Sequence, residues 1–375
     1  MAEERAVTVG GSSKLLKALN EAAALGFLLD RGRLTRAELK QLTGLSKPTV
    51  SEAVRRLAEA GLVVVAGEET GRPGPNAEVY AVNADAAYAV AVSVRDTAGS
   101  GAPSVTAALH DLRGERRSRL ARPVDFTSTD PVAAVGETID ALCAAADVGR
   151  GPVAHVQLAV AGAFDRRDRV IHHVDVPGWS RPGLVDDLEH ATRARVEIDN
   201  DVNLAALAER AHGAARGAGA FALLWLGAGG LGLAIDLGGG RLLRGARGGA
   251  GEVGYIPMGA GDFHALVGPE AVAALAAEHG PGSAAYLDAL AERITPGLAA
   301  VVAILDPPLV VLGGETGRAG GAPLAEAVAK AMSHAAPLET AVAASTVDDD
   351  APLLGAADAA VLAVRETLLE STRSQ

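Results

Sequence analysis

Hydroxyl and basic side chains gather in the first eighty residues of this chain. Residues 31–56 contain seven Lys and Arg against two acidic residues, and this local excess of positive charge would attract phosphate. Side chains on the first turns of a helix could reach base edges there, and an arginine one turn further could reach phosphate. The candidate DNA-contacting residues are Ser46, Lys47, Thr49, Ser51, Arg55 and Arg72.

Helix-capping signals indicate the elements that would position these residues. Helical periodicity predicts a first helix over 12–30, with an apolar stripe formed by Leu15, Leu16, Leu19, Ala23 and Phe27. Thr35 and Glu38 have the capping-box spacing for a second helix, which Gly44 would end. Ser46 would cap a third helix. The inward-facing residues of these two helices would be Leu39, Leu42, Val50, Val54 and Leu57.

A β-hairpin is expected after the third helix. Leu62–Ala66 and Val79–Val82 are the expected strands, and the loop Gly67–Glu78 between them is rich in Gly and Pro. Arg72 would stand at the tip of this loop, where it could contact a minor groove or the DNA backbone. This layout is typical of a winged helix-turn-helix, which we assign to residues 1–82. The alternative is an inert three-helix unit with an ordinary solvated face.

The distribution of charge favours DNA binding at this end alone. The whole chain has a net charge of −12, but residues 1–82 carry 11 basic and 10 acidic residues, so residues 83–375 hold a net −13. No apolar run approaches the ~18 residues that cross a bilayer, and the N-terminus does not resemble a signal peptide. Cys143 is the only cysteine, so we expect a cytoplasmic protein without internal disulfides and place Cys143 in the core.

The rest of the chain alternates between strand and helix patterns. A first set comprises strands at Tyr88–Val94, Ser104–His110, Glu115–Val124 and Val153–Val160, with a helix at Asp130–Ala146. A second set comprises strands at Val196–Asp199, Phe221–Leu226, Leu231–Asp236 and Leu309–Gly313, with a helix at Val202–Ala214. Two α/β lobes with a cleft between them fit this order.

Several ordered segments of this region resemble the ROK family (repressors, open reading frames and kinases). They are the Asn-Asp segment at Asp199–Glu209, the second phosphate loop at Gly227–Leu233, the sugar loop Gly251–Gly254, the late strand-turn Val310–Gly314, and Ala161-Gly162 with Pro177–Trp179. The resemblance implies an α/β fold with a two-lobed, actin/ribonuclease-H-like domain of the sugar-kinase type over residues 83–375. Lobe one would cover about 83–198 together with a C-terminal helix that returns to it, and lobe two about 199–350.

The resemblance also implies a sugar site, because carboxylates and amides pair well with hydroxyl groups. The implied ligand-binding residues are Asp175, Asn200, Asp201, Glu252 and Glu270. Asp175 stands where the family often has Asn, so an acceptor is kept and an amide donor is lost. Two plainer interpretations stay open. Asn200 and Asp201 could be only a helix cap, and Glu252 and Glu270 could be only solvated loop charges.

Kinase chemistry is not expected, although its base is present. In ROK kinases the base is the Asp of Asn-Asp, which is Asp201 here. The first phosphate loop, Asp-x-Gly-Gly-Thr, corresponds to Ser93–Thr97, where Arg95 and Asp96 replace the glycines that let the backbone approach phosphate. Ala228 replaces a Thr in the second loop. We therefore expect no enzymatic activity and no cofactor, with Asp201 as a vestigial base.

No metal site is expected either. The family's structural zinc is held by a His and three Cys, but Tyr255 stands at the His and residues 261–267 contain no thiol. His172 and His173 are adjacent on an expected strand and would point to opposite faces, which favours a surface pair over a metal site.

These observations predict a sequence-specific DNA-binding regulator, preferably a repressor, that responds to a sugar or sugar derivative in a degenerate kinase cleft. The expected partners are double-stranded operator DNA, the sugar and a second copy of the chain, in a homodimer or homotetramer, with no membrane contact. Two alternatives remain: a sugar kinase that is active and also binds DNA, and a regulator that responds to a phosphosugar, another metabolite or a protein partner.

Overall fold

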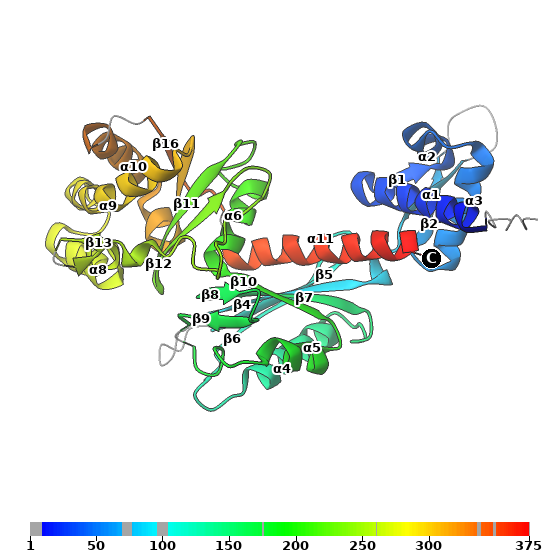
Figure 1. Ribbon diagram of the computed structural model, residues 1–375, viewed down its shortest axis with the longest axis horizontal. Helices are drawn as coiled ribbons and strands as arrows, with labels where there is room; N and C mark the ends of the chain where they lie inside the picture. The colour runs from blue at the N-terminus through cyan, green and yellow to red at the C-terminus, as the bar shows by residue number, and fades with distance from the viewer. Residues whose placement is uncertain are drawn as a thin grey trace, which may run out of the picture.

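The computed structural model describes residues 10–69, 77–95, 104–174, 176–259, 261–335, 339–347 and 350–374. Figure 1 shows a small N-terminal module, two α/β lobes, and a long C-terminal helix, α11 (Ala351–Ser374), that runs from between the lobes to the module. None of the helices in the described ranges is long and apolar enough to cross a membrane.

The N-terminal module combines three helices with a small antiparallel sheet. Its elements are α1 (Gly10–Arg31), β1 (Arg33–Thr35), α2 (Arg36–Thr43), α3 (Lys47–Glu59), β2 (Val63–Glu69) and β3 (Ala77–Val82). The strand order is β1-β3-β2, and both pairings are antiparallel. The hairpin strands extend further into the predicted loop than the sequence indicated. The tip of that loop, with Arg72, lies outside the described residues.

The predicted caps of α2 and α3 are confirmed. The Thr35 side chain accepts a hydrogen bond from the backbone N–H of Glu38, whose carboxylate accepts one from the N–H of Thr35 at 2.7 Å. Gly44 follows α2 with φ +70°, a conformation that Gly adopts without strain. Ser46 accepts from the N–H of Thr49 and so fixes the start of α3.

The predicted apolar stripe of α1 is wrong at its three leucines and at Ala23, whereas Phe27 packs against the core as expected. Leu15, Leu16 and Leu19 are exposed, and the buried face consists of Ala18, Ala22, Ala24, Leu25 and Leu28. Both α3 and α11 contact α1, and small alanines let neighbouring helices approach closely. In the short helix α2 only Leu39 is buried, whereas Leu42 is 37% exposed.

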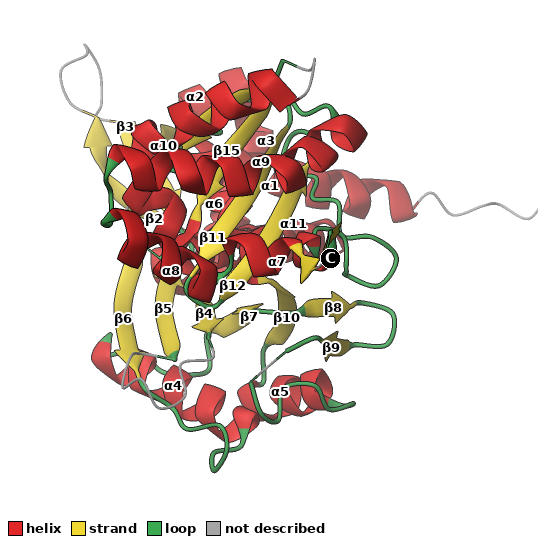
Figure 2. Ribbon diagram, turned by 90° about the vertical axis from the view of Figure 1, so that its left-hand side faces the viewer, coloured by secondary structure: helices red, strands yellow, loops and turns green. Residues whose placement is uncertain are grey.

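Lobe one is a five-stranded sheet with helices on both faces. Its elements are η1 (Ala84–Ala86), β4 (Tyr88–Val94), β5 (Val105–Asp111), β6 (Arg116–Arg122), α4 (Pro131–Ala145), β7 (Val153–Val160), β8 (Ala163–Asp165), β9 (Val170–His172), α5 (Leu184–Thr192) and β10 (Arg195–Asn200). The strand order is β10-β7-β4-β5-β6. Helices α4 and α5 cover the outer face, as Figure 2 shows, and Cys143 is buried there as predicted.

Lobe two is built on a four-stranded sheet of order β12-β11-β15-β16. Its elements are α6 (Asp201–His212), β11 (Phe221–Gly227), β12 (Gly230–Asp236), η2 (Val253–Tyr255), β13 (Pro257–Met258), β14 (Gly261–Asp262), α7 (Phe263–Val267), α8 (Pro269–His279), α9 (Ala284–Leu305), β15 (Leu309–Gly313), α10 (Gly314–Ala335) and β16 (Ala341–Ala344). Successive side chains of β11 point to opposite faces of the sheet and pack against different helices. Leu224 packs with α9 and α10, and Leu223 packs with α6.

Helix α11 belongs to both the lobes and the N-terminal module. Ala357, in its first half, shares a core cluster with Leu204 of α6 and with lobe one. Val361 and Val364, further along, belong to the core of the N-terminal module. A Cβ atom on Gly355 would lie 1.7 Å from the backbone oxygen of Leu204, so α11 and α6 cross at a distance that only Gly permits.

Candidate ligand cavity and DNA-binding face

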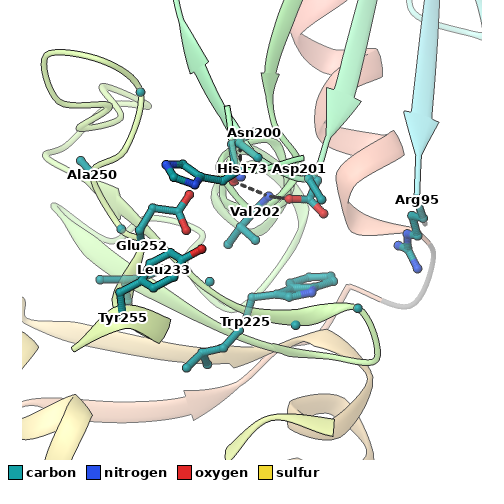
Figure 3. A pocket seen from close by; sticks show the side chains of 18 of the residues that line it. Arg95, His173, Asn200, Asp201, Val202, Trp225, Leu233, Ala250, Glu252 and Tyr255 are labelled. Atoms are coloured by element: carbon teal, nitrogen blue, oxygen red, sulfur yellow. Dashed lines mark hydrogen bonds between the residues drawn. The ribbon is translucent and has the colours of Figure 1, made fainter. Parts of the chain in front are cut away.

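A cavity of about 260 Å³ lies between the lobes, where β10 ends and α6 begins. The side chains and backbone that line it include Arg95, His173, Asn200, Asp201, Trp225, Gly229–Leu233, Glu252, Tyr255 and Glu315. In Figure 3 the carboxylates of Asp201 and Glu252 point toward the same space. The fold therefore brings together Asn200, Asp201 and Glu252, three of the five residues that the sequence indicated for a ligand.

Asn200 is a helix cap and also part of the cavity wall. Its side-chain oxygen accepts hydrogen bonds from the backbone N–H groups of Val202 (2.9 Å) and Asn203 (3.2 Å). Its amide nitrogen donates to the carbonyl oxygen of Gly162 at 3.1 Å. The capping interpretation is thus confirmed for Asn200, and its remaining capacity toward a ligand is one amide hydrogen.

The turn that carries Asn200 is fixed from behind by an ion pair. The Arg244 guanidinium donates to Asp199 Oδ2 through Nε (2.8 Å) and Nη2 (2.6 Å). Asn203 Nδ2 donates to the other oxygen of the same carboxylate at 3.1 Å. Because Asp199 is buried and hydrogen-bonded through both oxygens, it orients the β10–α6 junction and does not face the cavity.

Asp201 is the first residue of α6 and lies in the cavity wall. Its Oδ1 accepts from the N–H of Val202 at 2.9 Å. Burial raises the pKa of this carboxyl to about 6, while the charge of Arg95 and the backbone hydrogen bond oppose the rise. The raised pKa means that the ionised carboxylate is poorly solvated, so it would gain most from a ligand that donates hydrogen bonds.

This raised pKa predicts that the Asp201 carboxyl lowers the free energy of unfolding by an amount that depends on pH. Below the ordinary pKa of 3.8 the carboxyl is protonated in both the folded and unfolded states and costs nothing. The loss of stability grows as the pH rises and reaches its full value above about pH 6, because the carboxyl ionises at a lower pH in the unfolded chain than in the folded one. Asp201→Asn should therefore raise the free energy of unfolding at pH 7.5, by up to about 3 kcal/mol, and leave it unchanged at pH 3.5.

Urea titrations at the two pH values measure this difference. Asp288→Asn, on an exposed turn of α9, is the matched control and should show no pH-dependent gain. If Asp201→Asn destabilises the protein at pH 7.5, the carboxylate is held by favourable contacts and the assigned burial cost is wrong.

Glu252 lines the same cavity from the loop before η2. Gly251 has φ +98°, and a Cβ on it would lie 1.9 Å from the backbone oxygen of Leu233, so this loop lies directly on β12. Burial raises the pKa of the Glu252 carboxyl, and the charge of His173 acts against this. Glu252 thus presents a poorly solvated acceptor to the cavity.

His173 is a cavity residue that the sequence did not indicate. It has φ +55°, which is uncommon for a residue other than Gly and places strain at the cavity wall. Its ring lies 6.0 Å from the ring of Tyr255, and both residues also line an outer cavity of about 480 Å³. His172 and His173 were assigned to the surface, and both are exposed, but a single positive φ turns His173 toward the ligand space. No pattern in the sequence predicts that φ.

Arg95 closes the opposite side of the cavity with two ion pairs. Its Nη1 lies 3.1 Å from Glu315 Oε1, and its Nη2 lies 3.0 Å from Asp350 Oδ1. The second carboxylate oxygen of Glu315 accepts from the N–H of Ala228 at 3.0 Å. Arg95 therefore joins lobe one to the start of α10 and to the residue that precedes α11.

The other two predicted ligand residues are not placed in the cavity. Glu270 is exposed in the first turn of α8 and is not among the residues that line it. The expectation that all five residues meet in one cavity is thus not met, because α8 presents Glu270 to solvent. Asp175 lies outside the described residues. Within the described part of the chain, no group of three or more His, Cys, Asp or Glu is arranged to hold a metal ion.

The N-terminal module presents α3 with an exposed face. Ser46, Lys47 and Thr49 stand at its start, and Ser51 follows one turn later. Lys47 is exposed, as a base- or phosphate-contacting residue must be. Arg55 is also exposed, but it is paired with Glu52 at 2.7 Å and with Glu59. The cation predicted to contact phosphate is thus already engaged within its own helix.

Two family models match separate parts of the chain. A model described as the ROK family matches residues 99–269 and 264–363, and one described as the MarR family matches residues 16–72. The crystal structure of a ROK family transcriptional regulator, a homologue of the E. coli MLC protein, aligns over 96% of this chain and 99% of its own. Its TM-score is 0.71 at 18% identity, so this likeness shows the fold. The predicted fold class is confirmed.

Two relatives of known function match parts of the chain. The bifunctional enzyme NanE/NanK of Brucella suis biovar 1 (strain 1330) is 34% identical over 192 residues, which are 45% of this chain and 35% of that protein. The xylose repressor of Bacillus subtilis (strain 168) is 24% identical over 247 residues, which are 65% of this chain and 61% of that protein. The chain thus spans about a third of the first relative and less than two thirds of the second.

Proposed function

The chain belongs to the ROK family, and from this premise we propose that it is a DNA-binding repressor that a sugar or sugar derivative releases from its operator. The observation that carries the proposal is structural. One continuous helix, α11, packs on the helix that forms the cavity wall and on the core of the winged module. The match of residues 16–72 to the MarR family and the likeness to the xylose repressor support the DNA-binding half.

The cavity suits a ligand that carries several hydroxyl groups. Asp201 and Glu252 are two poorly solvated acceptors that face one space, and a polyol can donate to both. Trp225 and Tyr255 add flat apolar surface on which a sugar ring can lie. The outer cavity next to Tyr255 leaves room for a substituent larger than a hydroxyl group.

A path for the signal leads from this cavity to the DNA-binding module. Asp201 begins α6, which crosses α11 at Gly355 in direct backbone contact. The His212 Nε2 atom lies 2.7 Å from Asp358 Oδ2 and ties the far end of α6 to the same helix. A ligand that moves α6 relative to lobe one would therefore shift α11, and with it the winged module.

We propose that the protein does not phosphorylate this ligand. The likeness to the kinase NanK keeps the kinase alternative in view. However, Arg95 and its partners Glu315 and Asp350 stand at the position that corresponds to the first phosphate loop, and Ala228 stands in the second. One guanidinium against two carboxylates leaves a net negative charge here, which would repel the phosphates of a nucleotide. Asp96 and Thr97, which complete the corresponding segment, lie outside the described residues.

A coupled ATPase assay with hexoses and N-acetylhexosamines is therefore expected to show no turnover above a protein-free blank. The NanK enzyme, run in parallel, provides the positive control for the assay. Turnover that disappears in the Asp201→Asn variant would establish the kinase alternative instead.

The proposed function as a whole is tested by release of DNA. Duplexes that the protein selects from a random library would be bound in a fluorescence anisotropy assay, and D-xylose, D-glucose and N-acetyl-D-glucosamine would be added in turn. A sugar that binds the folded state should raise its stability by about 2.7 kcal/mol at a hundredfold excess over Kd, and it should release the duplex. If a sugar stabilises the protein without releasing the duplex, or if only a phosphosugar releases it, the alternative is favoured: a regulator that responds to a phosphosugar, another metabolite or a protein partner.

The oligomeric state and location follow the same proposal. Winged modules generally read paired half-sites, so we propose a homodimer or homotetramer that acts on chromosomal DNA in the cytoplasm. Sedimentation velocity would measure the number of copies directly.

A further inference from the structure

Glu52 holds both arginines of α3 from the middle of the helix. Arg55 donates to its two carboxylate oxygens, through Nε at 3.0 Å and Nη2 at 2.7 Å. Arg56 Nε donates to Glu52 Oε1 at 2.8 Å. These hydrogen bonds lower the pKa of the Glu52 carboxyl to about 2, with the bond from Arg55 as the largest cause. The carboxylate is therefore charged at neutral pH.

Two further carboxylates complete the neutralisation. Arg55 also pairs with Glu59, and Arg56 lies 3.3 Å from Glu21 of α1. The exposed cations in the second half of α3 thus have internal partners before any DNA arrives. Lys47, at the first turn, forms no ion pair within the described part of the chain, so it can contact DNA.

Glu52 is half exposed and lies on α3 at the edge that adjoins α1. Val50, Val54 and Leu57 fix the buried side of α3. At 3.6 residues per turn, Glu52 stands roughly opposite these residues, in line with Arg55. It is also close to the first turns of the helix, which are the part that enters a major groove in winged and helix-turn-helix modules.

A carboxylate on this side of α3 would be attracted to few groups of DNA and repelled by its many phosphates. The exocyclic amino group of cytosine donates into the major groove and pairs with Glu, whereas phosphates repel it. Exposed ion pairs such as Glu52–Arg55 contribute little net free energy, so they can exchange partners when phosphates come within reach. When Arg55 turns to a phosphate, the Glu52 carboxylate loses a hydrogen-bond donor. It regains one only where a cytosine amino group lies within reach.

Given the proposed DNA-binding function, we propose that Glu52 is a specificity-determining residue. Away from its operator, the Glu52 carboxylate occupies Arg55 and Arg56 and lowers the affinity for random DNA. On the operator, Glu52 accepts a hydrogen bond from a cytosine amino group, and Arg55 turns to a phosphate. The same side chain thus penalises wrong sequences and reads the right one.

The test compares Glu52→Gln with Glu59→Gln in the full chain. Both variants remove one negative charge and one partner of Arg55, but Glu59 stands two turns further from the first turn of the helix. Affinities for a selected operator and for a random 20-base-pair duplex are measured by anisotropy over a range of salt concentrations. Circular dichroism and the thermal midpoint confirm that each variant is folded.

Glu52→Gln is expected to raise affinity for the random duplex about three- to tenfold and to steepen its log–log salt dependence by about one unit, because one or two arginines become free for phosphates. Its operator affinity should fall or stay level, so the ratio of the two affinities falls at least tenfold. Glu59→Gln should raise both affinities alike and leave the ratio within twofold.

A ratio that falls equally in both variants would overturn the proposal, because the effect would then be net charge alone. An unchanged affinity of Glu52→Gln for random DNA would also overturn it. Glu52→Asp provides an independent check: the shorter side chain keeps the charge but withdraws from the base, so only operator affinity should fall. If the wild-type protein binds neither duplex, the DNA-binding function itself fails, and this result differs from all the others.

Discussion

Combined replacement of Lys47, Arg55 and Arg72 by Ala is expected to weaken operator binding about thousandfold. Lys47 stands at the first turn of α3, and Arg55 can exchange its carboxylate partners for phosphate. Arg72 is assigned to the wing tip from the sequence alone. Each lost contact to a base or phosphate costs about 1–2 kcal/mol, and three such losses multiply. The log–log slope of affinity against salt should flatten by about two to three units.

A matched control separates local contacts from net charge. The control residues lie in the two lobes: Arg181 just before α5, Arg195 on β10 and Lys330 on α10. Their combined replacement by Ala also removes three positive charges. This control should keep operator affinity within about threefold, since screening at physiological salt limits distant charges. Equal losses in the two triple variants would exclude the N-terminal face as the DNA-binding site.

Replacement of Glu252 or Asp201 by Ala should produce a repressor that no longer responds to its sugar. Each change leaves ligand hydroxyl groups without an acceptor in a buried site, at about 1–3 kcal/mol per group, so sugar affinity should fall ten- to hundredfold. Operator affinity without sugar should change less than twofold, because neither residue contacts the winged module. Isothermal titration with the sugar identified by its effect on thermal stability measures the first quantity, and anisotropy the second.

Glu270→Ala supplies the comparison for these variants. Glu270 is exposed on α8 outside the cavity, so sugar affinity should stay within twofold in this variant. Weakened operator binding by Glu252→Ala or Asp201→Ala in the absence of sugar would mean that these carboxylates support the fold instead of sensing a ligand.

The local elements of the chain could be predicted because their signals are short-range. The capping box of Thr35 and Glu38, the Gly44 turn and the Ser46 cap depend only on residues up to four positions apart. The same is true of the Asn200 cap at the start of α6. The strands of both lobes were predicted from local patterns, and Val153–Val160 was predicted as a buried strand, as the structure shows.

The buried face of α1 could not be predicted from the same kind of pattern. Leucines at helical spacing normally indicate the core side, but here Leu15 and Leu16 face solvent while Ala18 and Ala22 are buried. The reason is that α11 arrives from the other end of the chain and packs on α1. The spacing of apolar residues along α1 does not show which face a helix more than 300 residues away in the sequence will cover.

The sequence by itself determined the two-part architecture, the position of the Asn-Asp segment at the start of α6 and two of the cavity carboxylates, Asp201 and Glu252. Only the tertiary structure decided what these residues are free to do. It committed the oxygen of Asn200 to the helix cap, turned His173 into the cavity through a positive φ, and placed Glu270 outside. It also paired Arg55 with Glu52 and Glu59, and Arg95 with Glu315 and Asp350. Residue type fixes which hydrogen bonds and charges a side chain can offer, but packing of distant segments decides which of them remain available to a ligand or to DNA.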